Sequence, residues 1–222
     1  LKITTRSDQA AADKDIAAGK FVVVPNDEHL TVVRSGYSLY GSHRHYLCGS
    51  SDNGGCTLDA CAEAGKTVFT EWSSSTTLPT TAGKYYLSGN VTLSERPVIK
   101  ENVTLCLNGY TVSIASGKAA NIWVDGGKLT ITDCQGTGKL KGPGKELVGV
   151  DIRNSAGALN LYGGTITDFL YGIRNTGGSC SLYAGVLTGN RAGVYNTGAL
   201  AMYGGDITGN GGFCSGAGVY NS

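Results

Sequence analysis

The chain has 222 residues, of which 41% are hydrophobic, 16% are charged, 35 are Gly and 4 are Pro, and its formal net charge is +1. This apolar content excludes a disordered chain, and the absence of a G-X-Y period excludes collagen. A nearly neutral chain without a long Lys/Arg cluster is not expected to bind nucleic acid. The sequence contains no run of 18 apolar residues, so no membrane-spanning segment is predicted in it. Because so many glycines suit corners with positive φ, the composition favours a fold that turns often.

Residues 1–40 are expected to form a cap or accessory segment with one helix and short strands. Ser7 or Asp8 could cap a helix over the alanine-rich stretch that follows. Strand candidates come next at residues 21–24 and 30–34, on either side of a Pro-Asn-Asp turn. Nothing in this segment indicates a function.

Residues 41–75 form a module that is rich in His and Cys and has no hydrophobic periodicity. Five potential metal ligands lie within nineteen residues: His43, His45, Cys48, Cys56 and Cys61. Any four could close a tetrahedral structural zinc site, and metal binding would supply the folding energy that the segment lacks. A disulfide among the three cysteines, expected in an oxidising compartment, is the alternative.

Residues 76–222 are predicted to be repetitive. The segment at residues 159–167, Leu-Asn-Leu-Tyr-Gly-Gly-Thr-Ile-Thr, has copies at 180–188 and 200–208, and a second element ending in Asn recurs at 172–175, 193–196 and 218–221. A period near 20 with two or three short strands is typical of a coil, whereas a β-propeller needs about twice that period. Alternation places the leucines on one face. We therefore predict an all-β fold, a right-handed single-stranded parallel β-helix.

Stacked coils align equivalent residues into ladders. Tyr162, Tyr183 and Tyr203 are expected to stack on the outside, where the rings either bind sugar faces or pack on one another. Packing of this kind stabilises each pair by ~0.5–1.5 kcal/mol. The asparagines at 175, 196 and 221 are expected to share one turn and to exchange amide hydrogen bonds between coils, which is a structural role.

Four of the seven cysteines lie in the repeats. Cys180 aligns with leucines of the neighbouring repeats and is expected to be a buried apolar residue. Cys106 and Cys134 occupy related positions of consecutive coils, and thiols are expected there in preference to a disulfide. Cys214 lies in an insertion that lengthens the last coil.

The segments at residues 78–87, 90–93, 105–112, 133–138 and 162–167 resemble a family of large β-helix repeat surface proteins of gut Firmicutes, which are similar to pectate lyases in fold and carry Tyr-Gly-Gly-Thr-Ile-Thr repeats. The resemblance covers roughly residues 43–222. It implies a secreted or bacterial cell-surface protein. It also implies a His- and Cys-rich stretch before the helix, although Tyr46 stands where another Cys is expected. Because the chain starts at Leu1 and stops at Ser222 within a repeat, we expect a longer parent protein with further coils.

The first functional hypothesis is a non-catalytic adhesin or stalk that contacts glycans or host and bacterial surface molecules. Low charge and many Thr, Ser, Asn and Tyr residues suit weak, multivalent contact. The alternative is a polysaccharide-cleaving enzyme, a lyase or glycosidase, or a fragment of one. A glycosidase needs two carboxyl groups about 5–10 Å apart. The nearest candidate is Asp151 as a base with Arg153 and Arg174 as substrate clamps, and an ordinary surface ion pair is the competing explanation.

Overall fold

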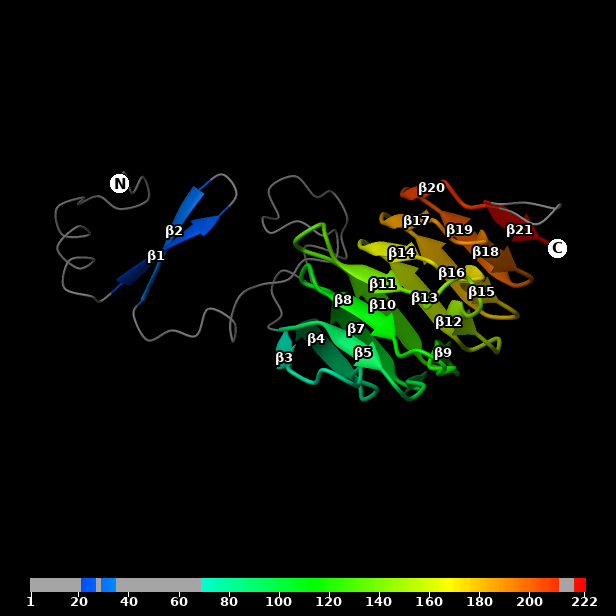
Figure 1. Cartoon of the computed structure of the whole chain (residues 1–222), viewed down its shortest axis with the longest axis horizontal. Helices are drawn as coiled ribbons and strands as arrows, with labels where there is room; N and C mark the ends of the chain where they lie inside the picture. The colour runs from blue at the N-terminus through cyan, green and yellow to red at the C-terminus, as the bar shows by residue number, and fades with distance from the viewer. Residues whose placement is uncertain (1–20, 27–28, 35–68, 212–217) are drawn as a thin grey trace. The chain divides into compact units, whose positions relative to one another are not determined.

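The computed structural model describes residues 69–211 and 218–222 in full and the backbone of residues 21–26 and 29–34. The chain divides into two compact units, Leu1–Ser42 and His43–Ser222. In the first unit, β1 (Phe21–Asn26) pairs antiparallel with β2 (His29–Arg34), in agreement with the two predicted strands (Figure 1). The predicted helix, residues 41–68 of the His/Cys module with all five candidate zinc ligands, and Cys214 lie outside the described residues.

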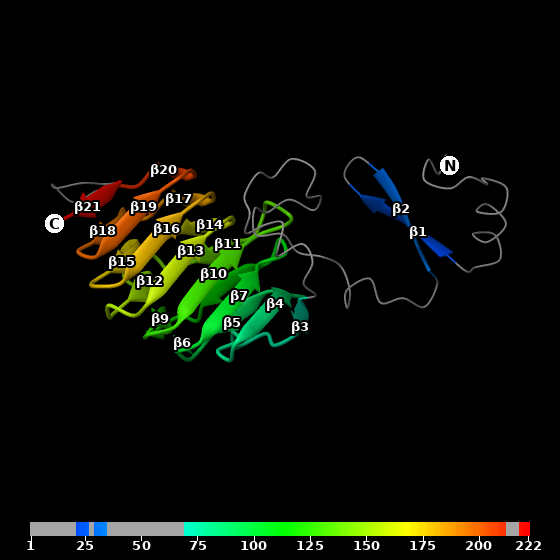
Figure 2. The ribbon, with the colours of Figure 1, turned by 180° about the vertical axis from the view of Figure 1, so that it is seen from behind.

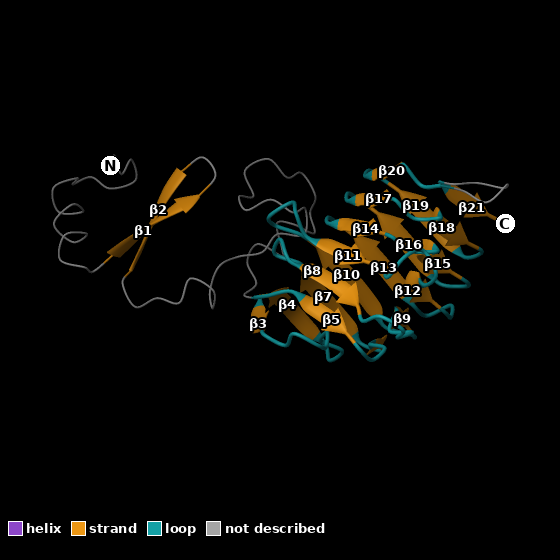
Figure 3. Ribbon diagram, in the orientation of Figure 1, coloured by secondary structure: helices purple, strands orange, loops and turns teal. Residues whose placement is uncertain are grey.

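The second unit is a parallel β-helix, as the repeats predict. Its strands fall into three parallel sheets, and strands of successive coils lie side by side from β3 to β21 (Figures 1 and 2). Within the described ranges every regular element is a strand (Figure 3). From β4 onward each coil contributes one strand to each sheet, so the side chains at one position form a row along the axis.

The first sheet contains β3 (Thr70–Trp72), β4 (Gly83–Leu87), β7 (Asn102–Cys106), β10 (Lys128–Thr132), β13 (Ala158–Leu161), β16 (Ser179–Leu182) and β19 (Ala199–Met202). The second sheet contains β5 (Val91–Leu93), β8 (Thr111–Ile114), β11 (Lys139–Lys141), β14 (Thr165–Thr167), β17 (Val186–Thr188) and β20 (Asp206–Thr208). The third sheet contains β6 (Val98–Ile99), β9 (Ile122–Val124), β12 (Val148–Ile152), β15 (Tyr171–Asn175), β18 (Ala192–Asn196) and β21 (Val219–Asn221).

The core is the inside of the coil. Alternation along each strand turns every second side chain inward, and in-register pairing stacks like on like. In the first sheet, Leu161 lies between Ile131 and Leu182, and all three are buried in one apolar cluster. Met202 follows in the same row on the edge strand β19, and it is 48% exposed because it has a coil on one side only.

The Tyr-Gly-Gly motif marks a corner between the first two sheets. Gly164, Gly185 and Gly205 occupy equivalent places there with φ of +85°, +93° and +88°. This region of φ is strained for residues with a side chain, so glycine is needed at each copy of the corner.

Asparagine side chains link the coils at two corners. Asn175 Nδ2 donates to Asn196 Oδ1 at 2.8 Å, and Asn196 Nδ2 donates to Asn221 Oδ1 at 2.6 Å, which confirms the predicted ladder. The sequence analysis did not identify the second corner, where Asn190 Nδ2 donates to Asn210 Oδ1 at 3.1 Å. These amides satisfy buried backbone groups and fix the register of the coils.

The three described cysteines are buried thiols: Cys180 lies in the core of the coil, and Cys106 and Cys134 lie in a separate apolar cluster with Phe69 and Tyr86. Cys180 pairs in register with Leu159 and Leu200 and is 1% exposed, and burial raises its pKa to about 12. Cys106 donates to Cys134 across 3.4 Å between the sulfur atoms, which is a hydrogen-bond distance and not a disulfide. Burial, with the hydrogen bond to Cys134 as a second cause, raises the pKa of Cys106 well above its usual value.

Candidate functional site on the outer face of the third sheet

The strands of the third sheet present one row of side chains to the outside. In β9, Ile122 and Val124 are core residues, so Trp123 between them points outward, and the same alternation applies in the following coils. Register aligns five residues in one row, which we call the third-sheet ladder: Trp123, Asp151, Arg174, Tyr195 and Tyr220. Neighbouring strands lie about 4.8 Å apart, so the ladder spans roughly 19 Å.

Asp151 is the electrostatic centre of this ladder. Arg174 donates from Nε to Oδ1 at 2.9 Å and from Nη2 to Oδ2 at 2.6 Å, and Arg153 Nη1 lies 3.5 Å from Oδ2. The Asp151 side chain is 0% exposed, whereas those of Arg153 and Arg174 are 44% and 34% exposed. The ion pair expected from the sequence is therefore present, although its carboxylate is buried and only its arginines reach the surface. The hydrogen bonds to Asp151 raise the pKa of Arg174 above its ordinary value.

Trp123 lies between two guanidinium groups. The Cζ atom of Arg96 is 3.9 Å from the ring centroid, and that of Arg153 is 4.2 Å away. Arg96 comes from the coil before Trp123 and Arg153 from the coil after it, so the two groups approach the ring from opposite sides along the axis. A tryptophan ring attracts such cations electrostatically.

Positive charge exceeds negative charge around Trp123. Arg96 donates to neutral acceptors, with Nε 3.1 Å from Asn121 Oδ1 and Nη2 2.8 Å from the carbonyl oxygen of Ala119. Among the described residues, neither Glu95 nor Asp125 forms an ion pair with these guanidinium groups, and Asp125 accepts from the Asn154 amide at 2.7 Å. Of the three arginines near Trp123, only Arg153 and Arg174 therefore form ion pairs, both with Asp151, while Arg96 forms none with a described residue.

The other end of the ladder is aromatic. Tyr195 and Tyr220 are stacked with ring centroids 5.1 Å apart and planes at 8°. Tyr171 lies beside them, 5.2 Å from Tyr195 at a tilt of 42°. The third-sheet face thus changes along the axis from guanidinium groups around an indole to tyrosine rings.

A second outer row follows the first sheet, and we call it the tyrosine ladder: Tyr162, Tyr183 and Tyr203. Its rings stack with centroids 4.3 and 4.8 Å apart and planes at 2° and 12°, which confirms the predicted stack. The picture of three exposed rings is wrong, because Tyr162 is 5% exposed and only Tyr203, at 70%, is fully open. Since the facing ring surfaces cover one another, they are closed to a sugar.

A second buried carboxylate, that of Asp133, builds a turn. Asp133 is 1% exposed and accepts backbone N–H groups from Gly109 at 2.7 Å and from Gly138 at 2.6 Å. Its role is to hold the corner of the coil.

In the described part of the chain, no group of three or more His, Cys, Asp or Glu could hold a metal ion. The predicted zinc ligands lie outside that part: His43, His45, Cys48, Cys56 and Cys61.

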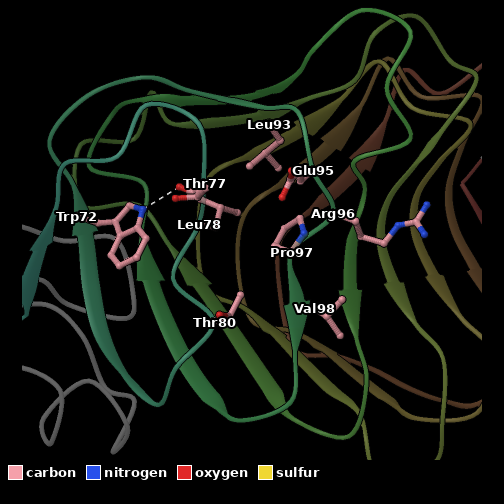
Figure 4. Close-up of a pocket in the computed structure, with 9 residues that line it drawn as sticks. All are labelled: Trp72, Thr77, Leu78, Thr80, Leu93, Glu95, Arg96, Pro97 and Val98. Atoms are coloured by element: carbon pink, nitrogen blue, oxygen red, sulfur yellow. Dashed lines mark hydrogen bonds between the residues drawn. The ribbon is translucent and has the colours of Figure 1, made fainter.

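A cavity of about 480 Å³ opens at the first coil. Its lining is largely apolar: Trp72, Thr77, Leu78, Thr80, Leu93, Glu95, Arg96, Pro97 and Val98. The Trp72 indole N–H donates to the carbonyl oxygen of Thr77 at 2.7 Å, and the guanidinium of Arg96 points away from the cavity (Figure 4). The aliphatic stem of Arg96 therefore lines the cavity, while its guanidinium group lies at the outer face of the third sheet.

Arg96 and Trp123 were missed by the sequence analysis because neither repeats from coil to coil. Tyr195 and Tyr220 did carry a signal in the sequence, since both precede the Asn of the second repeat element.

The described ranges contain no helix that is long and apolar enough to cross a membrane. Comparisons of the chain with protein-family models, with curated proteins and with solved structures find no match.

Proposed function

We propose that this chain is a non-catalytic β-helix module of a secreted or cell-surface protein, an adhesin or stalk that contacts glycans or host surface molecules through the outer face of its third sheet. The proposal extends to further coils of a longer parent protein, which would repeat the same lateral surface. Weak contacts repeated along such a surface add to a useful avidity.

One observation carries the proposal. Both carboxylate oxygens of the buried Asp151 accept hydrogen bonds from Arg174 within the third-sheet ladder, and the ladder presents guanidinium and aromatic groups to the outside. A general base must reach the proton that it removes. Asp151 is instead covered and held by Arg174 in a bidentate pair. Arginine and aromatic side chains are the groups that dominate binding surfaces energetically.

The stacking of the coils gives this surface its rigidity. Trp123, Asp151 and Arg174 stand on consecutive strands whose backbones are hydrogen-bonded in register. A surface held in this way loses little conformational entropy when it binds, which favours recognition by many weak contacts.

A polysaccharide-cleaving enzyme remains the second candidate, and Asp151 with Arg153 and Arg174 is the observation that favours it. Asp125 lies two residues after Trp123, directly after β9, so alternation places a second carboxyl group on the same face. Both carboxylates are already hydrogen-bonded, Asp125 to Asn154 and Asp151 to Arg174.

The test uses the purified chain with a panel of neutral and acidic host and plant glycans. Retention is measured by affinity chromatography, and new reducing or unsaturated ends are measured in the same samples. Retention without new ends is the expected result. New ends that disappear in an Asp151→Asn variant would overturn the non-catalytic proposal, and a chain that is retained by no glycan would overturn the glycan-contacting one.

A further inference from the structure

The guanidinium groups around Trp123 form a positively charged surface, and not all of their N–H donors are used within the described chain. A guanidinium group has five N–H donors. Arg96 uses two of them on neutral oxygens, and Arg153 makes one contact of 3.5 Å with Asp151. The remaining donors can therefore serve a ligand that carries negative charge.

The geometry decides how many charges such a ligand needs. The two ring distances, 3.9 and 4.2 Å, place the guanidinium carbons of Arg96 and Arg153 at most about 8.1 Å apart, on opposite sides of Trp123 along the axis. One small anion cannot form a bidentate pair with both groups across the indole ring. A chain that carries anionic groups at intervals can contact both.

We propose that Arg96 and Arg153, held on either side of Trp123, form a binding site for an acidic glycan, a polysaccharide whose sugars carry carboxylate or sulfate groups. This inference rests on the proposed glycan-contacting function and specifies its ligand class. The guanidinium fork pairs with such oxyanions in a bidentate manner, which a lysine ammonium cannot reproduce.

Trp123 contacts both arginines of the site, and Asp151 contacts Arg153. The indole centroid lies 3.9 and 4.2 Å from the guanidinium carbons of Arg96 and Arg153, and Asp151 also pairs with Arg174. The bidentate Arg174–Asp151 pair shows in this same face the geometry that a ligand carboxylate would adopt. Arg174 is one-third exposed and lies on the next strand, where it extends the charged row.

The test measures binding of hyaluronan, which carries carboxylates only, dextran sulfate, which carries sulfates only, and neutral dextran, by biolayer interferometry on the whole chain. The Arg96→Gln/Arg153→Gln variant removes two charges from the site. Lys139→Gln/Lys141→Gln removes two charges from exposed positions of β11 in the second sheet and is the matched control. We expect at least one acidic polymer to bind, with an affinity at least tenfold weaker for the arginine variant and less than twofold weaker for the lysine variant.

Equal losses in the two variants, or no binding of either acidic polymer, would overturn the inference. If the chain is retained by neutral glycans and ignores both acidic polymers, the proposed function stands and the ligand class is wrong. If it is retained by nothing in the panel, both the proposed function and this inference fail.

Should the glutamine variant not fold, Arg96→Lys/Arg153→Lys keeps the positive charge and loses the forked N–H donors of the guanidinium group. An affinity at least threefold weaker is then expected, and unchanged affinity would contradict recognition by guanidinium groups.

Discussion

The two outer ladders of the β-helix share one geometry and differ in composition. The tyrosine ladder repeats a single residue type, so each ring finds its partner in the next coil, at 4.3 and 4.8 Å. The third-sheet ladder changes residue from coil to coil, and it combines an indole, a carboxylate, a guanidinium and two phenols. In a row of identical rings, each ring stacks on the next one. In a row of different residues, some polar groups have no partner within the row and face solvent or a ligand.

Both ladders depend on the same core, and a core substitution should have the largest effect. Leu161→Ala removes a side chain that is 0% exposed and directly precedes Tyr162. We expect the free energy of unfolding, measured by chemical denaturation, to fall by about 2–5 kcal/mol. Asn160→Ala, on the outward side of the same strand, is the control and should change it by less than about 0.5 kcal/mol.

The Asp151→Asn substitution separates stability from binding in the third-sheet ladder. It removes the buried charge that Arg174 contacts at 2.6 Å, so the free energy of unfolding should fall by about 1–3 kcal/mol. The Asn oxygen can still accept from the arginines, but the negative charge is lost from the proposed site, so the acidic glycan should bind more tightly. Weaker binding by this variant at a temperature where it is folded would contradict the proposed site.

The Tyr183→Ala substitution tests whether the tyrosine ladder is structural. Tyr183 stacks against both Tyr162 and Tyr203, so the loss of the ring should destabilise the chain by about 1–2 kcal/mol. Tyr183→Phe retains the ring and should unfold at the wild-type temperature. Glycan binding should be the same in all three proteins, and its loss in Tyr183→Ala alone would identify this ladder as a binding surface.

Cys180 should make the stability of the coil depend on alkaline pH. Its pKa is raised from 9.0 to about 12 in the folded chain, so the folded state holds the thiol proton more strongly than the unfolded state does. This contribution is fully present below pH 9 and is lost as the pH rises towards 12, by about 1.4 kcal/mol at pH 10. Denaturation curves of the wild type and of Cys180→Ala should converge by that amount between pH 8 and pH 10. Parallel curves would show that the thiol is not the titrating group.

The repetitive parts of the fold could be predicted from the sequence because every coil restates them. The tyrosine spacing gave the coil period, and alternation gave the inward rows that contain Leu161 and Cys180. The Asn175 ladder followed from the same repetition. The second ladder, Asn190 with Asn210, had an equally clear signal in the Thr-Gly-Asn copies at 188–190 and 208–210.

The candidate site could be predicted only in part, because it is assembled from single residues of different coils. The sequence placed Arg153 and Arg174 near Asp151, but not the burial of the carboxylate, which depends on how long side chains lie over it. Arg96 and Arg153 are brought to Trp123 by cross-coil register, and no local pattern marks that contact. Exposure of the tyrosine rings was misjudged because a residue at an outer position can still be covered by its neighbours.

The most direct test of the difference between the ladders is a comparison of hyaluronan and dextran sulfate affinities for three proteins: the wild type, Arg96→Gln/Arg153→Gln and Tyr183→Ala/Tyr203→Ala. Each is measured below its unfolding temperature, with far-UV circular dichroism as the check on folding. The account predicts that the arginine variant loses at least tenfold in affinity while the tyrosine variant binds as the wild type does. Loss of binding in the tyrosine variant together with full binding by the arginine variant would contradict it.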